Sequence, residues 1–569
     1  MSIRRLLILL LLTATAFAVA SPSPDHHEFE ASLYVPFKGE NSGARDFNLS
    51  FNYIDAVEPT TVVWRIEIFA KGGSLVRSMV GENRLFRQPV NIPVTWDGLN
   101  DQNETLANGF YVARMTASAG VPSAVRSNGT TQRERVRETL ARDDDAIEQE
   151  WELVIGDAPS VAMPEFLALP NSKTIGKSKS ANGGLPFTVY YGNLHTQSND
   201  SDGGGDVASC SGSQSAQSGA FGPSTGFEYA RNRGLDFSAA TEHNHYFDGS
   251  SGTNSAADPA VARARYQAGL AAATSSSAAN PGWLALYGME WGVISNGGHM
   301  NIFGSNELFA WEYNSSNALI GDVFTPKSNY PAIYATMQQR QLVGQFNHAS
   351  SSGQFLVNGT ALGYDAAGDE VMVLAEIQNT SAFSNNITET ETGRSSYESA
   401  FKLLLERGFH VAPSTNQDNH CANWGASWTN RTAVLIPNGQ PISTSSFTEA
   451  LRARRVFASS DKNSQLVFTA NGRLMGERFS NSGPLTLVTN FANSQGRTVA
   501  QVQVFEGVPK RNGTVTVLAT VPSYTFTPSA GEHFYYAKIT QDDGKLLWSA
   551  PLWVTQTQEN DPLFANGFE

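Results

Sequence analysis

The chain has 569 residues, too many for one hydrophobic core, and predicts three or four structural units of roughly 100 to 200 residues each. Charged residues make up only 16% and the net charge is −14, which excludes a basic surface for nucleic acid or anionic lipid. Abundant Gly, Ser, Thr and Asn favour a β-rich protein with long ordered loops.

The N-terminus has the pattern of an export signal. Arg4 and Arg5 precede the apolar run 6–12, and a small-residue cleavage site ends at Ala20. The alternative, a membrane anchor, requires about 20 apolar residues, more than this run contains. We therefore predict a signal peptide over residues 1–20, and a secreted or periplasmic protein with no membrane span after the signal is removed.

Residues 31–125 predict a β-sandwich. Apolar and polar residues alternate over 62–69 and 90–96, and turns containing glycine separate the runs. The segments 96–98 (Trp-Asp-Gly) and 106–112 (Leu-Ala-Asn-Gly-Phe-Tyr-Val) resemble the immunoglobulin-like module of flagellar hook-capping proteins. This resemblance implies that the tryptophan lies in the core and that the glycines form turns, and it concerns fold rather than function.

Residues 126–185 are expected to be a linker. The segment 131–151 is dense in charge and could form a surface helix, with its acidic groups on a solvated face. The segment 171–184 is rich in Lys, Ser, Gly and Asn, which is typical of flexible connectors.

Residues 186–460 alternate short apolar strands with helices, the pattern of repeated βα units. Such units imply a parallel sheet, which we expect to roll into a distorted (β/α) barrel. The expected strands are 187–194, 235–240, 283–287, 341–346, 371–377, 409–413 and 432–436, and the expected helices are 226–234, 332–340 and 396–407.

Alternation of period two returns over residues 461–556 and predicts a second β-sandwich. Residues 557–569 form a tail that resembles, over 561–569, a short terminal tag of exported proteins in some bacteria. The predicted fold class is therefore multidomain: a distorted parallel (β/α) barrel flanked by an N-terminal immunoglobulin-like domain and a C-terminal β-sandwich domain.

Histidines are concentrated in the predicted barrel, where seven of the 10 lie between residues 195 and 420. Four predicted strands lead directly into side chains of metal-ligand type. In a βα barrel, residues just past the C-terminal strand ends converge at one mouth, where the chemistry is sited. Imidazole and carboxylate groups without thiolate suit zinc, manganese or iron. These side chains are His195, Glu242, His243, His348, Asp418 and His420.

Six segments of this region resemble, in order, the motifs of the PHP (polymerase and histidinol phosphatase) superfamily, and are most similar to its CehA/McbA-type metallohydrolase branch. The family pattern begins with Leu-His-x-His-Ser and Ser-Asp-Gly, continues with Thr-Asp-His, a strand with a metal-bridging glutamate and a glycine-flanked histidine strand, and ends with two further ligand motifs. The similar segments are 193–203, 235–243, 287–291, 298–304, 347–348 and 418–420. This chain departs from the pattern at Gln197, where the family has a second histidine, and at Glu242, where it has aspartate.

The resemblance implies two or three divalent ions (zinc, manganese or iron) held by three groups of ligands. For each histidine the alternative is a buried side chain satisfied by the backbone, and Asn301 on the same strand face as His299 is an alternative ligand. For Asp202 the alternative is a role in shaping a turn. The implied groups are His195, Glu290 and Asp418 with Gln197 as a weak fourth; Glu290, His299 and His348; and Asp202, His243 and His420.

Catalysis by such a site follows from its charge. Two cations on one bridging water lower its pKa from about 15.7 towards 7, which provides hydroxide at neutral pH. His245 or His420 is then expected to protonate the leaving group. Arg431 is the nearby cation able to grip a phosphate at two points, and its alternative role is that of a salt-bridge partner.

The two cysteines, Cys210 and Cys421, both lie beside candidate metal ligands. In an oxidising compartment they could form a disulfide that clamps the site, or they could remain two thiols. The sequence leaves both alternatives open, because it does not give the separation of their Cα atoms.

These features predict an exported metal-dependent hydrolase that cleaves phosphomonoesters or phosphodiesters, with a small-molecule ester as substrate. Hydrolysis of a carbamate or carboxyl ester at the same site is the nearest alternative, because the similar branch includes such enzymes. A non-catalytic surface binding protein stabilised by metal is a second alternative, favoured by the two sandwiches and by Gln197. An extracellular nuclease is a third, but the acidic chain lacks a basic groove, so no nucleic-acid partner is expected.

Overall fold

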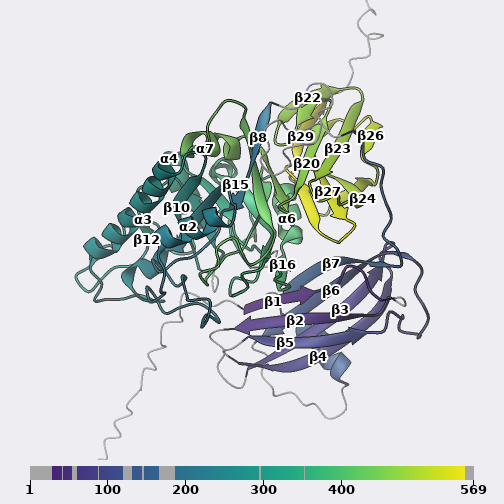
Figure 1. The fold of residues 1–569 in the computed structure, drawn as a ribbon, viewed down its shortest axis with the longest axis horizontal. Coiled ribbons are helices and arrows are strands. Elements are labelled where there is room, and N and C mark those ends of the chain that lie inside the picture. The colour runs from purple at the N-terminus through teal and green to yellow at the C-terminus, as the bar shows by residue number, and fades with distance from the viewer. Residues whose placement is uncertain are drawn as a thin grey trace, which may run out of the picture.

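The computed structural model describes residues 29–40, 43–53, 60–86, 89–119, 131–143, 146–165, 186–293, 297–350 and 353–557. The predicted signal peptide, the Lys/Ser/Gly-rich connector and the tail after residue 557 lie outside the described residues. Three units are seen: an N-terminal sandwich, a central unit of strands and helices, and a C-terminal sandwich (Figure 1). Within the described part of the chain, every helix is too short or too polar to cross a bilayer.

The N-terminal unit consists of two facing sheets with strand orders β1-β2-β5 and β4-β3-β6-β7. The alternating residues of these strands bury one face each, so that the two inner faces form a common core. Trp96 is fully buried in it and stacks on Phe47 with ring centroids 6.0 Å apart, as the hook-capping resemblance implies for this tryptophan. The strands are β1 Phe29–Tyr34, β2 Arg45–Tyr53, β3 Thr60–Ala70, β4 Leu75–Leu85, β5 Val90–Trp96, β6 Gly109–Ala119 and β7 Ile147–Ile155.

The N-terminal sandwich extends beyond residue 125, into the segment that the sequence predicts as a linker. Helix α1 (Gln132–Leu140) begins at a Thr131 cap with the reciprocal Glu134 bond of a capping box. Strand β7 then pairs antiparallel with β6. The expected surface helix is thus found over the first part of the charge-dense segment 131–151. In β7, by contrast, the charged residues alternate with buried Trp151, Leu153 and Ile155 and lie on the solvent side of a strand.

The central unit holds a mixed sheet, not the parallel one that the sequence predicts. Strands β8, β9 and β10 run parallel to one another, as do β14, β15 and β17, but β11 is antiparallel to both of its neighbours. Only residues 292–299 separate β10 from β11, fewer than the dozen or so that a parallel crossover needs. The strands are β8 Phe187–Asn193, β9 Phe237–His243, β10 Leu284–Trp291, β11 Met300–Phe303, β12 Phe309–Ala310, β13 Val323–Phe324, β14 Val343–Phe346, β15 Met372–Thr380, β16 Arg394–Ser396, β17 Ala412–Asn416, β18 Arg431–Pro437 and β19 Val456–Ser459.

Strands β17 and β18 approach each other but do not complete a ring. Thr432 Oγ1 accepts a hydrogen bond from Thr415 N (3.0 Å) and donates one to Thr415 O (2.9 Å). Among the described residues no backbone ladder joins these two strands, whereas β18 pairs antiparallel with β8 and β19. The closed barrel therefore stays a prediction.

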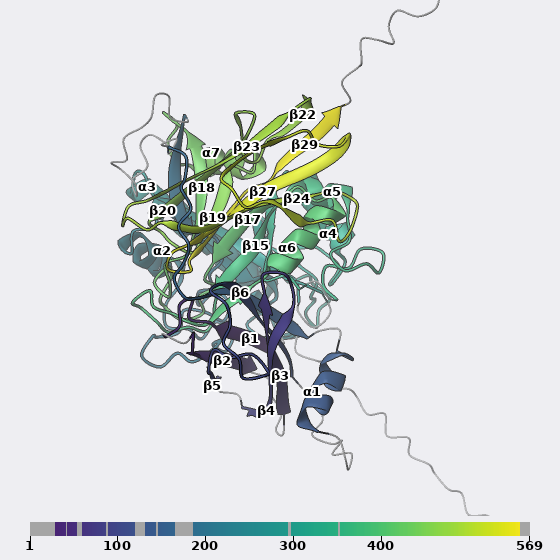
Figure 2. The same ribbon diagram turned by 90° about the vertical axis from the view of Figure 1, so that its right-hand side faces the viewer.

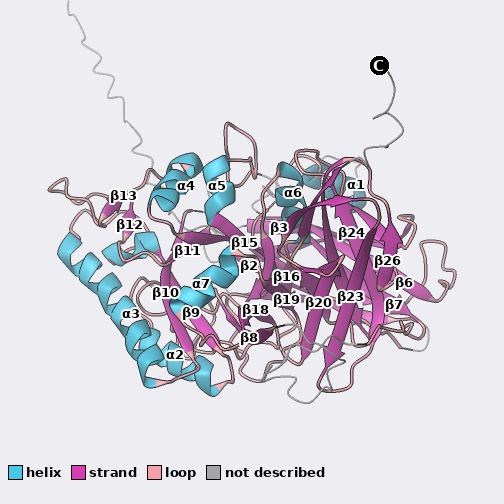
Figure 3. Cartoon of the chain, turned by 90° about the horizontal axis from the view of Figure 1, so that it is seen from above, coloured by secondary structure: helices cyan, strands magenta, loops and turns pink. Residues whose placement is uncertain are grey.

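Helices lie along the outside of the central sheet (Figure 3). The longest of them, α3, begins at an Asp258 cap followed by Pro259, and its Gly269 packs so closely on β10 that an added Cβ would meet the Tyr287 ring. Helix α2 ends just before Gly234, whose positive φ of 82° is the expected helix-stop conformation. The helices are α2 Pro223–Asn232, η1 Asn244–Asp248, α3 Pro259–Ala279, α4 Tyr330–Gln339, α5 Ala366–Val371, α6 Glu398–Arg407 and α7 Thr444–Arg452.

The C-terminal unit is joined to the central sheet by continuous strand pairing. Strand β19 pairs with β28, which pairs with β27, so both units share one sheet, while β21-β20-β23-β26 forms the facing sheet. In Figure 2 the long strand β27 runs beside β24 and β29 above the N-terminal sandwich. The strands are β20 Ser464–Ala470, β21 Arg473–Leu474, β22 Arg478–Ser482, β23 Leu485–Asn493, β24 Val499–Gly507, β25 Thr516–Ala519, β26 Ser523–Phe526, β27 Gly531–Gln541, β28 Leu546–Ser549 and β29 Leu552–Thr557.

One buried lysine connects all three units. Lys538 of β27 places its Nζ 2.9 Å from Glu398 Oε2 of α6 and 3.4 Å from Glu152 Oε1 of β7. Thr540 Oγ1 also donates to Glu152 Oε2 (2.5 Å). Because these side chains are nearly excluded from water, the charges have few other partners and tie the units together.

Candidate metal centre

Strand ends of the central sheet deliver the candidate ligands to one place. His195 follows β8, His243 ends β9, Glu290 lies near the end of β10, and His348 follows β14. Each of the first three is fully buried, and the His348 side chain is 11% exposed. The convergence that the sequence predicts at the C-terminal strand ends is therefore present in space for these residues.

Glu290 lies at the centre of this cluster, and four imidazoles face its two oxygens. His195 Nε2 lies 2.9 Å and His243 Nδ1 3.4 Å from Oε2. His299 Nδ1 lies 3.1 Å and His348 Nε2 3.2 Å from Oε1. Glu290 is shared by two of the groups of side chains that could hold a metal ion.

Asp418 and Gln197 complete the surroundings of His195. Asp418 Oδ1 lies 3.0 Å from His195 Nε2, so the predicted partnership of these two residues is found. Gln197 is oriented differently from the expected weak ligand. Its Nε2 donates to Glu290 Oε2 (2.7 Å), while its Oε1 accepts from Ser201 Oγ (2.9 Å). The amide thus orients the central carboxylate, and its oxygen is already engaged by the protein.

A third group lies beside the first two. His243 Nε2 is 3.7 Å from Asp202 Oδ1, and His420 Nε2 is 3.5 Å from Asp202 Oδ2. Asp202 and His420 are fully buried. These three residues are the third set that the PHP resemblance implies.

The donor set fits divalent ions. Three groups of nitrogen and oxygen donors have ligand atoms within 4.8 Å of one another: His195, Glu290 and His348; His243, Glu290 and His299; and Asp202, His243 and His420. Compared with the predicted groups, His348 joins His195, and His299 joins His243. Buried carboxylates without nearby cations would be strongly destabilising, so this chemistry calls for positive charge. Imidazole with carboxylate suits zinc, manganese or iron.

Electrostatics of the cluster reflect the same need for positive charge. Burial by itself lowers the pKa of His195, but Asp418, Glu290 and Glu376 raise it well above its ordinary value. Burial opposes ionisation of Glu290, yet the surrounding imidazoles hold its pKa well below the usual range. Burial raises the pKa of Asp418 to about 6 despite the attraction of His195. Each carboxylate thus depends on cationic neighbours for its charge.

His245 lies at the edge of the cluster. Its ring is 5.8 Å from that of His243 and stacks on Trp311 at 5.7 Å between centroids. It follows β9 in the short helix η1 and is buried. This location keeps His245 close to the predicted ligands without making it a member of any ligand group above.

Arg431 is not placed as a phosphate clamp, which corrects the sequence prediction. Its guanidinium donates to Glu389 Oε1 (3.0 Å) and to the carbonyls of Gly425, Trp428 and Asn430 at 3.0, 3.0 and 2.7 Å. The side chain is 2% exposed. Its donors hold the 425–431 loop, and this is the salt-bridge role that the sequence left as the alternative.

Glu376 of β15 is a site residue that sequence reasoning missed. Its Oε1 lies 2.9 Å from His195 Nδ1 and its Oε2 accepts from His348 N (2.8 Å). Burial raises the pKa of this carboxyl, but His195 and His348 bring it below its ordinary value. A signal was present in the sequence, because Glu376, like Glu290, is a glutamate inside an apolar strand.

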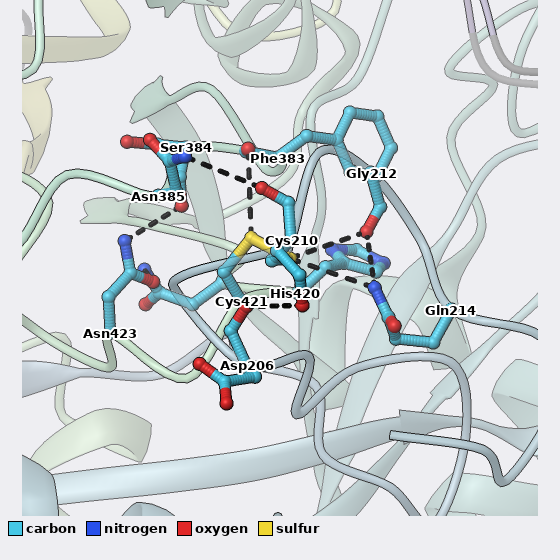
Figure 4. The surroundings of a disulfide bond; sticks show 12 residues. Asp206, Cys210, Gly212, Gln214, Phe383, Ser384, Asn385, His420, Cys421 and Asn423 are labelled. Carbon is cyan, nitrogen blue, oxygen red and sulfur yellow. Dashed lines mark hydrogen bonds between the residues drawn. A yellow bond between two sulfur atoms is a disulfide. The ribbon is translucent and has the colours of Figure 1, made fainter. Parts of the chain in front are cut away.

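A disulfide between Cys210 and Cys421 resolves the alternative that the sequence left open (Figure 4). Cys421 directly follows His420, and Cys210 belongs to the same loop as Asp202. Backbone bonds accompany the bridge, since Gly205 N donates to His420 O (3.1 Å). The disulfide therefore clamps together the two loops that carry Asp202 and His420.

Comparison with known proteins assigns no family. No protein-family model and no curated protein matches the chain. Among solved structures, fibronectin(III)-like modules of Clostridium thermocellum CbhA share 11% identity over 25% of this chain and 66% of theirs, with a TM-score of 0.14. A Parabacteroides merdae β-glucuronidase shares 10% identity over 95% of this chain and 65% of its own, with a TM-score of 0.18.

A Bacteroides uniformis β-glucuronidase is similar at 9% identity, over 93% of this chain and 61% of its own length, with a TM-score of 0.15. The chain thus spans somewhat less than two thirds of the length of the β-glucuronidases that it matches. At these TM-scores the similarity assigns neither a fold nor an activity to the chain.

Proposed function

We propose that this protein is an exported metal-dependent hydrolase that cleaves phosphoester bonds. The observation that carries the proposal is Glu290, whose two oxygens each face two imidazoles at 2.9 to 3.4 Å. Export is supported by the N-terminal pattern of the sequence and by the Cys210–Cys421 disulfide, a bond typical of oxidising compartments.

The three ligand groups described above would hold the ions. When bound, divalent ions there supply Lewis acidity and lower the pKa of water from about 15.7 towards 7. The chain's own residues prepare the site. Gln197 Nε2 donates to one oxygen of Glu290, and Asn347 Nδ2 donates to the other (2.8 Å), so the central carboxylate is held in one orientation.

His245 is the group that we propose as the proton donor to the leaving oxygen. It lies beside the ligand groups, whereas His420, the other candidate, contacts Asp202 within one of them. Since Arg431 is committed to Glu389 and to backbone carbonyls, the metal ions and the histidines would meet the negative charge of a phosphate.

Turnover by the purified chain tests the proposal. The substrates are p-nitrophenyl phosphate, its bis ester and a naphthyl carbamate, each with added zinc or manganese. We expect hydrolysis of a phosphoester that EDTA abolishes and that His195→Ala removes. His410→Ala is the matched control, because His410 pairs with Asp369 outside the cluster (2.8 Å). Turnover of the carbamate alone would instead support the carboxyl-ester alternative.

A non-catalytic metal-stabilised binding protein is the second candidate. The near-complete burial of the ligands favours it, because structural metal sites are closed whereas catalytic sites keep a position open. Stoichiometric metal with no turnover of any substrate above would support this function and refute the hydrolase.

A further inference from the structure

Glu376 contacts two candidate ligands, His195 and His348, and it lies on the side of His195 away from the proposed metal. Its Oε1 lies 2.9 Å from His195 Nδ1. The other ring nitrogen, Nε2, faces Glu290 Oε2 and Asp418 Oδ1 at 2.9 and 3.0 Å. Since the two nitrogens lie on opposite edges of one imidazole, Glu376 is on the far side of His195 from the proposed metal.

The same carboxylate also fixes the backbone of a second ligand. His348 N donates to Glu376 Oε2 (2.8 Å) at a residue whose φ is 29°, in the region that residues other than glycine rarely adopt. A buried carboxylate that accepts this N–H stabilises the unusual conformation. One side chain thus contacts two histidines, His195 and His348, that share a ligand group with Glu290.

Glu376 is itself held rigidly. Asn379 Nδ2 donates to Oε2 (2.7 Å), and Asn416 Nδ2 and Gln345 Nε2 donate to Oε1 at 2.8 and 3.2 Å. These amides come from β14, β15 and β17, so three strands fix the carboxylate. Its side chain is fully buried. Such a network resists reorientation when a neighbouring group changes.

We propose that Glu376 is a positioning residue that sets the metal affinity of the centre. By accepting the Nδ1 proton of His195 it selects the tautomer in which Nε2 carries the lone pair and points it toward Glu290. By accepting His348 N it holds the second histidine of the same group in place. This inference rests on the proposed function, because it assumes that the cluster binds metal.

Metal affinity of the full chain tests the inference. Glu376→Ala is expected to weaken zinc binding by about 10- to 100-fold in competition with a chromophoric chelator. In Glu376→Gln the amide oxygen can still accept from His195 Nδ1, but the amide nitrogen cannot accept from His348 N. This variant is therefore expected to lose less zinc affinity than Glu376→Ala. The matched control is Glu406→Gln, a buried glutamate of α6 that accepts from Gly513 N (2.9 Å) and Thr514 N.

A second readout does not depend on metal or turnover. In the metal-free chain, the Nδ1–H of His195 is expected to give a downfield imidazole ¹H signal coupled to a protonated ¹⁵N, because Glu376 Oε1 accepts from it, and Glu376→Ala is expected to lose this signal. An unchanged Nδ1–H signal, or unchanged zinc affinity in a folded variant, would overturn the inference. So would an equal loss of affinity in Glu406→Gln. If the wild-type chain binds zinc but hydrolyses nothing, the proposed hydrolase fails while the role of Glu376 is still decided.

Discussion

Removal of the Cys210–Cys421 disulfide is expected to lower stability substantially. The bridge closes a loop with a sequence separation of 211 residues. In the chain-entropy relation a loop of that length removes about 18 cal/mol/K from the unfolded chain, or about 5 kcal/mol at 25 °C. Because the bridge joins the loops of Asp202 and His420, the loss is expected in the central unit.

Urea unfolding of the Cys210→Ala/Cys421→Ala double variant, in EDTA, measures the effect. Tryptophan fluorescence follows the unfolding of all three units, and Trp291 and Trp424 contribute the signal of the central one. Treating the wild-type chain with reductant keeps the side-chain volume and should reproduce most of the decrease, which separates the cross-link from any cavity left by the substitutions.

Reductant should leave the double variant unchanged, since it holds no further bridge to break. A variant whose free energy of unfolding lies within about 1 kcal/mol of the wild-type value would refute the reasoning. Such a result would mean that residual structure in the unfolded chain already restricts it as much as the disulfide does.

Three further outcomes are expected. Lys538→Met should lower the free energy of unfolding by about 3 kcal/mol, because Glu152 loses its buried cation and Glu398 keeps only Lys402 (2.8 Å). Burial opposes the charges, but ion pairing lowers the pKa of Glu398 below its ordinary 4.5 and raises that of Lys538 above 10.5. The stabilisation by these ion pairs is therefore lost as the pH falls below 4.5 and as it rises above 10.5. The difference in free energy of unfolding between Lys538→Met and the wild type should be constant from about pH 5 to 10. A difference that varies across that range would contradict the pairing. Zinc at 100 times its dissociation constant should raise the stability of the EDTA-treated chain by about 2.7 kcal/mol in thermal unfolding, and an equal effect on His195→Ala would place the ion elsewhere. Arg431→Met should lower stability, and Glu389→Gln should lower it less, while KM for a phosphoester stays unchanged. A large rise in KM for Arg431→Met would instead support the role as a phosphate clamp.

Seven strands of the central unit (β8, β9, β10, β14, β15, β17 and β18) and most of its candidate ligands could be predicted from the sequence, because each leaves a local pattern. His195, His243 and His348 each end or follow a short apolar run, and such a run predicts a strand that ends near it. Glu376, like Glu290, is a glutamate inside an apolar strand, but it lies outside the motifs of the resembled family. Its importance depends on contacts with residues far away in the chain, which the sequence does not display.

The sequence also failed to predict other elements, because their residue patterns fit more than one kind of structure. Helix α3 has many small residues and little apolar periodicity, so only its Asp258-Pro259 start indicates it. The direction of β11 depends on the length of a connection rather than on the composition of the strand. Strand β7 was masked by charge, because glutamates on its solvent side alternate with the buried Trp151.

The sheet shared by the central and C-terminal units limits how recombination can separate these two units. A gene fragment for residues 186–460 alone would encode β19 without β28, the strand to which it is bonded, and so expose an unsatisfied row of amides and carbonyls. Such a fragment would tend to pair with other chains. Recombination is therefore expected to move these two units together, whereas the N-terminal sandwich, which shares no backbone ladder with either of them among the described residues, can be exchanged more readily.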